Sequence, residues 1–194
     1  MAAAAKPECY LALLHYPVLN KHGQVVTTAV ANMDIHDIAR AARTYGIARY
    51  YIVTPVAAQR DLVRTVLDHW QQGYGATYNP SRREAFNRVA IGETLEDILR
   101  QIEERSGFSP RIVVTGAALD KDLISCRELQ VMLAAGKQPF LLVFGTGWGL
   151  AESVIARADY CLAPVRGAAG DYNHLAVRSA VAIVLDRLYG CRED

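Results

Sequence analysis

The sequence predicts one α/β domain over residues 1–194, built on a parallel sheet of about six strands with helices on both faces. Three observations lead to this fold class. Short apolar runs alternate with helical patterns along the chain, as in βαβ units. The runs are nearly continuous, which is typical of strands buried on both faces. At 194 residues and 52% hydrophobic content, the chain can bury a core without metal or disulfide staples.

The predicted strands are apolar runs, rich in β-branched residues, that end at turn signals or polar side chains. They cover Tyr10–His15, Tyr50–Thr54, Arg88–Ile91, Arg111–Thr115, Pro139–Phe144 and Tyr160–Ala163. Ligands of parallel sheets bind beyond the carboxyl ends of the strands. We therefore expect a binding site at the loops that follow Thr115, Phe144 and Ala163.

Helical spacing of apolar residues fills the intervals between the strands. The first helix is predicted over Asn32–Tyr45, with Asn32 as its N-cap and Gly46 as its stop. Further helices are expected within Leu62–Trp70, Leu95–Ile102, Ser125–Ala135, Leu150–Arg157 and Val177–Leu188. The stretch Gly73–Asn87 has no clean period, so we expect a long loop there.

Composition and cysteine use exclude several classes of protein. The formal net charge of +1 argues against a polybasic nucleic-acid binder, although a local basic patch remains compatible with it. The four cysteines form no C-x-x-C pair, so we expect no metal site and a reducing, cytoplasmic location. We expect no signal peptide in Met1–Pro7 and no membrane contact, because no apolar run approaches about 20 residues.

A glycine-rich loop, Gly145–Gly149, follows one of the buried strands. Its glycines allow a sharp turn and a close approach of backbone to ligand. It has neither the lysine of a phosphate-binding P-loop nor the third glycine of a dinucleotide fingerprint. A plain tight turn and a ligand loop both remain open from the pattern alone.

Three further groups of residues have side chains suited to a functional role, but the presence of each group also has a simpler structural explanation. His36, Arg40 and Arg43 share the polar face of the first helix, which either is solvated or faces an anionic substrate. Asp171 and Asn173 precede the last helix, where Asp171 alone is best explained as an N-cap. A last group combines aromatic and basic residues and suits either RNA contact or a solvated loop. It comprises Tyr74, Tyr78, Arg82, Arg83 and Arg88.

Three ordered blocks together resemble the SPOUT class of RNA methyltransferases. Asn32–Arg40 places an Asn near the start of a first helix and an Arg about two turns later. Leu142–Leu150 is a strand that runs into a Phe-Gly loop with further glycines. Ala163–Val165 is a proline turn that is followed, after a spacer, by Asp171–Asn173 at the start of a helix.

The resemblance implies a C-terminal trefoil knot that holds bent S-adenosylmethionine, and an obligate homodimer with the substrate site at its interface. Asn32 and Arg40 of one subunit are the expected catalytic residues, and they would face the methyl donor of the other. The expected cofactor-binding residues are Thr115, Gly116, Gly145, Ala163, Val165, Gly167, Asp171 and Asn173.

The expected function is transfer of a methyl group from S-adenosylmethionine to structured RNA, either tRNA or rRNA, and not to DNA. Asp171 stands where many relatives have Ser, and Trp148 where a small or acidic residue is usual. These departures leave ribose 2′-O and guanine base acceptors open. The alternatives are a non-catalytic dimeric RNA-binding module that retains the fold, and an ordinary nucleotide binder, which the lack of G-x-G-x-x-G after the first strand disfavours.

Overall fold

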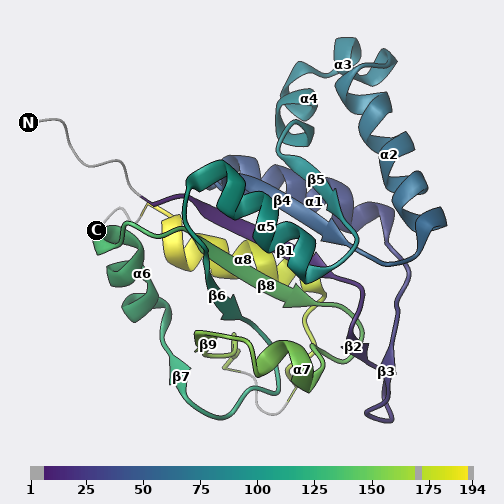
Figure 1. Ribbon diagram of the computed structural model, residues 1–194. Helices are drawn as coiled ribbons and strands as arrows, with labels where there is room; N and C mark the ends of the chain where they lie inside the picture. Colours follow the sequence, from purple (N-terminus) through teal and green to yellow (C-terminus); the bar gives the residue numbers. More distant parts are fainter. Residues whose placement is uncertain (1–6, 169–171, 192–194) are drawn as a thin grey trace, which may run out of the picture.

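A seven-stranded, entirely parallel sheet forms the centre of the molecule, in a computed structural model that describes residues 7–168 and 172–191 (Figure 1). Its strand order is β5-β4-β1-β8-β6-β9-β7. The strands are β1 (Cys9–Leu14), β4 (Arg49–Val53), β5 (Val89–Gly92), β6 (Arg111–Val114), β7 (Leu123–Ile124), β8 (Phe140–Gly145) and β9 (Tyr160–Leu162). The six predicted strands are confirmed, and β7 is an addition at the edge.

Helices cover both faces of this sheet, as the sequence predicts. One face carries α1 (Asn32–Thr44), α2 (Ala57–Gln71), α4 (Pro80–Phe86), α6 (Cys126–Ala135) and α8 (Val177–Tyr189). The other face carries α5 (Leu95–Ser106) and α7 (Glu152–Ile155). Strand β1 supplies both cores in alternation, because Leu11 and Leu13 pack on the first face while Tyr10, Ala12 and Leu14 pack on the second.

Three local predictions are wrong. The N-cap of α8 is Ala176 and not Asp171, because the helix begins only at Val177. The expected loop Gly73–Asn87 contains two short helices, α3 (Tyr74–Tyr78) and α4. Asn79 caps α4 by accepting a hydrogen bond from the Arg82 N–H at 3.0 Å, with Pro80 at the first helical position. Helix α1 begins one residue earlier than expected, so Ala31 is its N-cap and Asn32 already lies inside the helix.

The carboxyl edge of the sheet is closed by a small hairpin, β2 (Val18–Leu19) with β3 (Val25–Val26). This hairpin lies against the loop that follows β8. Two backbone hydrogen bonds join the hairpin to this loop, Trp148 N–H to Leu19 and Leu19 N–H to Gly149, both at 2.9 Å. Two more, at 3.2 Å, join the loop to the chain that leads into the hairpin: Thr146 N–H to Leu14 of β1, and Ala151 N–H to Pro17. These hydrogen bonds hold the loop after β8 against the hairpin.

The described segments between β9 and α8 pass close to the loop that follows β6. The Asn173 amide donates to the Ala117 carbonyl at 3.5 Å. Beyond it, α8 packs on α1, and Arg178 reaches Asp34 at 3.3 Å and Asp37 at 3.6 Å. Among the described residues, no helix is both long enough and apolar enough to cross a membrane.

Candidate cofactor and RNA site

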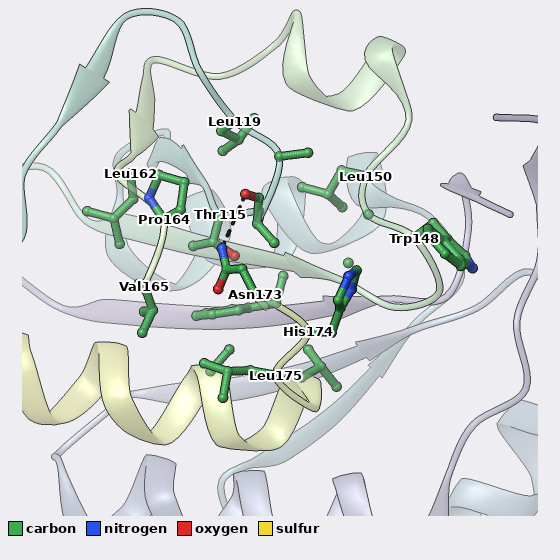
Figure 2. Close-up of a pocket in the computed structure, with 18 of the residues that line it drawn as sticks. Thr115, Leu119, Trp148, Leu150, Leu162, Pro164, Val165, Asn173, His174 and Leu175 are labelled. Atoms are coloured by element: carbon green, nitrogen blue, oxygen red, sulfur yellow. Dashed lines mark hydrogen bonds between the residues drawn. The ribbon is translucent and has the colours of Figure 1, made fainter. Parts of the chain in front are cut away.

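A cavity of about 850 Å³ opens where the carboxyl ends of β6, β8 and β9 meet the start of α8 (Figure 2). Four segments far apart in the sequence line most of it, and Leu19 of the hairpin and Ile155 of α7 also contribute. These segments are 115–119, 144–150 without Thr146, 162–165, and 173–184 in part. The volume lies in the upper part of the range of ligand pockets, about 300–1,000 Å³. All three loops that the sequence singles out therefore face one site.

The walls of this cavity are apolar and rich in small residues. The glycines and alanines that line it are Gly116, Ala117, Ala118, Gly145, Gly147, Gly149, Ala163, Ala176 and Ala180. Small side chains leave backbone N–H and C=O groups accessible to a ligand. Thr115 and Asn173 add side-chain polar groups, and His174 is the only titratable side chain among the described lining residues. Recognition here depends on backbone groups and apolar contact more than on charge.

Two glycines give the loop after β8 its shape. Gly147 has φ +61° and Gly149 has φ +114°, conformations that side chains with a Cβ rarely adopt. A Cβ on Gly147 would also lie 2.7 Å from the Leu19 carbonyl oxygen, which is a backbone atom. Glycine at 147 is thus required both by the turn and by the close approach of the hairpin.

A partly buried chain of polar groups supports this loop. The His15 Nδ1 lies 3.1 Å from the Thr28 hydroxyl, which in turn bonds the Thr146 hydroxyl. Thr146 donates to the Leu14 carbonyl at 3.1 Å. His15 is fully buried, and burial lowers its pKa to about 4, so the ring is neutral at physiological pH. The chain ties the end of β1 to the first turn of the glycine loop.

The structure brings six of the eight expected cofactor-binding residues into the cavity. They are Thr115, Gly116, Gly145, Ala163, Val165 and Asn173. Gly167 follows the lining segment 162–165 but does not itself line the cavity. Asp171 lies outside the described residues. Thr115 is fixed by its own hydroxyl, which donates to the Val143 carbonyl at 3.1 Å.

One expectation about Gly145 needs correction. From the sequence, a branched side chain at this position is expected to block the approach of a ligand. In the structure a Cβ there would first meet Leu150, at 2.8 Å from its Cδ2 and 2.9 Å from its backbone nitrogen. A substitution at Gly145 would therefore disturb the loop itself, and it is not a clean probe of ligand contact.

The two expected catalytic residues lie outside the cavity of this single chain. Asn32 and Arg40 are exposed on α1 and do not line it. Asp37, three residues before Arg40 on the same helix, pairs with Arg178. His36, expected on the solvated face, packs against Trp70 and Phe86 with ring centroids 5.6 Å and 4.8 Å away. That part of the polar face is covered because α2 and α4 fold over it.

Several lining residues are missing from the sequence-based site. They include Leu119, Trp148, Leu150, His174 and Leu175. The sequence does contain a signal for two of them: Trp148 stands inside the glycine loop, and His174 immediately follows Asn173. Leu119 had none, since only the fold brings the segment after β6 over the cavity.

The mixed aromatic and basic group divides into structural and exposed members. The Arg88 guanidinium donates to the Ile47 carbonyl at 2.6 Å, and the Arg82 guanidinium lies 4.6 Å from the centre of the Trp70 ring. Tyr74 and Tyr78 are exposed and stack on each other, with centroids 5.8 Å apart and planes 22° apart. Figure 1 shows α3, which carries both, projecting away from the sheet.

Similarity to solved structures defines the class of fold. The chain superposes on a probable methylase family protein from Haemophilus influenzae with a TM-score of 0.61 at 19% identity, covering 95% of this chain and 66% of that one. It also matches the SpoU methyltransferase AviRb from Streptomyces viridochromogenes in complex with AdoMet, with a TM-score of 0.58 at 16% identity, covering 95% and 57%. The fold is that of the SPOUT methyltransferases.

The sequence assigns the family. Residues 8–190 match the SAM-dependent RNA methyltransferase family, and the chain belongs to it. An uncharacterized protein from Aquifex aeolicus is 41% identical over 93% of this chain and 87% of its own length. A tRNA (guanine-N(1)-)-methyltransferase from Oleidesulfovibrio alaskensis is 43% identical over 93% of this chain but only 42% of its own length. The chain thus spans less than half of that relative.

Proposed function

We propose that this protein transfers a methyl group from S-adenosylmethionine to structured RNA, tRNA or rRNA. One observation supports this most strongly. The loops after β6, β8 and β9 line a single cavity at the carboxyl edge of a parallel sheet, in a chain of the SAM-dependent RNA methyltransferase family.

The cavity fits the proposed methyl donor. Its apolar walls suit the adenine ring, and the accessible backbone groups of its glycines and alanines suit the hydrogen-bonding edge of that ring. Thr115, Gly116, Gly145, Ala163, Val165 and Asn173 would hold the cofactor, whose sulfonium supplies the methyl group. The chain's own contribution is to position the reactants in line and to exclude water.

The chemistry needs groups that this cavity lacks. No Arg, Lys, Asp or Glu lines it among the described residues, so a charged group that positions the acceptor has to come from elsewhere. Arg40 is the proposed source, with Asn32, both from the partner subunit. A guanidinium is a poor proton acceptor at neutral pH, so Arg40 would hold a phosphate or an acceptor oxygen through paired hydrogen bonds.

A homodimer accounts for this arrangement. Met33 on α1 is 58% exposed, and the Arg178–Asp34 pair holds α1 and α8 together. Ala182 and Ile183 of α8 are only half-buried and do not line the cavity. Apolar groups on adjacent helices favour a second copy as cover. Light scattering at micromolar concentration should give twice the chain mass, and a monomer would count against the proposal.

Three further features belong to the same proposal. The passage of the segment before α8 beside Ala117 supports a trefoil knot, which an experimental electron-density map that traces residues 163–177 without a break would test. All four cysteines are free, which supports a cytoplasmic location. The stacked pair Tyr74 and Tyr78 is a candidate RNA contact distant from the methyl donor.

The decisive experiment has two arms. Calorimetry should show saturable binding of S-adenosylmethionine, and the labelled methyl group should then pass to tRNA or rRNA. Mass spectrometry of the nucleosides would distinguish a methylated guanine base from a 2′-O-methylated ribose. RNA binding without any transfer would favour the non-catalytic module, and failure to bind the methyl donor would refute the proposal.

A further inference from the structure

Three aromatic side chains stand exposed at one end of the cavity, and we call Trp148, Tyr172 and His174 the aromatic rim. Trp148 is 62% exposed and Tyr172 is 79% exposed. Tryptophan is highly buried on average in folded proteins, so an exposed one at a cavity is informative. The His174 ring lies 6.1 Å from Trp148 and 5.2 Å from Tyr172, edge-on to both.

The aromatic rim is continuous with the proposed cofactor cavity. Trp148 and His174 are part of its lining, whereas Tyr172 lies outside it. Figure 2 shows Trp148 and His174 at one end of the cavity and Leu162 and Pro164 at the other. A molecule on the rim would therefore adjoin whatever fills the cavity.

The backbone that carries Trp148 is fixed before any ligand binds. It lies between Gly147 and Gly149, both at positive φ, and its N–H donates to the Leu19 carbonyl at 2.9 Å. A ring presented by a fixed loop loses less conformational freedom on binding. This is the expected design of a recognition surface.

The chemistry of the rim suits a flat partner. All three members offer π faces or ring edges, and none carries a carboxylate. Bases that have left a helical stack are held in RNA complexes by stacking on Trp, Tyr, Phe or His. Enzymes that modify a base must first take it out of the stack.

We infer that the aromatic rim holds the acceptor nucleobase of the RNA, unstacked from its neighbours, at the mouth of the cofactor cavity. This inference rests on the proposed function and adds to it the group that the site recognises. Stacking of one base contributes about 1–3 kcal/mol, which corresponds to an affinity change of about 5- to 150-fold.

The test compares Trp148→Leu and Tyr172→Leu with the matched variants Trp148→Phe and Tyr172→Phe, which keep a ring. Phe108→Leu is the control, because Phe108 is an exposed aromatic residue just before β6, at the amino edge of the sheet. Each variant is assayed for S-adenosylmethionine affinity by calorimetry. Each is then assayed for KM and kcat with the RNA fraction, tRNA or rRNA, that accepts methyl groups.

A direct readout is available because the chain has two tryptophans. In a Trp70→Phe background the tryptophan fluorescence, excited selectively beside the ten tyrosines, comes from Trp148. Stacking of a base should quench it when the accepting RNA is added to the cofactor-bound protein.

The inference expects the Leu variants to raise KM for RNA about 5- to 150-fold at unchanged cofactor affinity, with the Phe variants near wild type. Wild-type RNA kinetics in both Leu variants, or no quenching of Trp148, would overturn it and leave the proposed function intact. Loss of cofactor affinity in the Leu variants would also overturn it, because the rings would then belong to the cofactor. A wild-type protein that neither binds S-adenosylmethionine nor transfers methyl groups would refute the proposed function and this inference together.

Discussion

Replacing Gly147 by alanine tests the architecture of the glycine loop most directly. The residue has φ +61°, and a Cβ there would sit 2.7 Å from the backbone oxygen of Leu19. Since a backbone atom cannot turn aside as a flexible side chain can, the loop has to move. The movement would break the hydrogen bond from the Trp148 N–H to the same oxygen.

The magnitude follows from two contributions. A left-handed backbone conformation costs about 1–2 kcal/mol for a residue with a Cβ. The lost hydrogen bond adds about 0.5–1.5 kcal/mol. We therefore expect Gly147→Ala to lower the free energy of unfolding by about 1.5–3.5 kcal/mol, which most domains survive.

Gly46→Ala is the matched control. Gly46 has a similar φ of +75°, but a Cβ there would meet nothing within 4 Å. Gly46→Ala should therefore lower the free energy of unfolding only by the conformational contribution, about 1–2 kcal/mol. Urea unfolding measures both variants, and calorimetry should show weaker S-adenosylmethionine binding for Gly147→Ala alone. Equal stability losses with equal cofactor affinities would refute the account of the loop.

Three other perturbations have defined outcomes. The unfolded-state pKa of His15 is about 6.5 and burial lowers the folded value to about 4, so stability should fall by about 3 kcal/mol as the pH drops through this window. Urea unfolding at several pH values should show that the free energy of unfolding depends less steeply on pH in His15→Gln than in the wild type. An unchanged pH dependence would contradict this. Arg178→Ala should lower the free energy of unfolding by about 1–2 kcal/mol, because the Asp34 side chain is only 9% exposed and loses its ion pair. A double-mutant cycle with Asp34→Asn measures the coupling energy between the two side chains. Arg40→Ala should remove about 2–4 kcal/mol of transition-state stabilisation and Arg40→Lys should also impair turnover, while cofactor affinity stays unchanged; near wild-type single-turnover rates would exclude Arg40 from the mechanism.

The sheet could be predicted from the sequence because its strands are buried on both faces and read as unbroken apolar runs. Strand β7, two residues long and partly exposed, has no such run. Helix α3 is too short for a period, so the segment that contains it resembles a loop. The Asn79-Pro80 pair that starts α4 was a readable signal, because Pro favours the first helical position.

The cavity was predictable in position but not in all of its members. Strand ends converge by topology, which is why Thr115, Gly145 and Val165 meet as expected. Long-range packing determined the rest. His36 is covered because Trp70 and Phe86, residues 34 and 50 positions further along the chain, fold onto it, with ring centroids 5.6 Å and 4.8 Å away. No local pattern records a contact of that kind.

Helix α8 lines the cavity and also packs on α1. Ala176, Ala180 and Val184 face the cavity from the helix or its N-cap, while Arg178 holds Asp34 of α1. Occupancy of the cavity and docking of this helix are therefore linked equilibria. A ligand at about 100 times its Kd would stabilise the docked helix by about 2.7 kcal/mol, and amide hydrogen exchange in α8 would slow accordingly. A molecule bound at the end of the sheet would thus strengthen the packing of two helices along one of its faces.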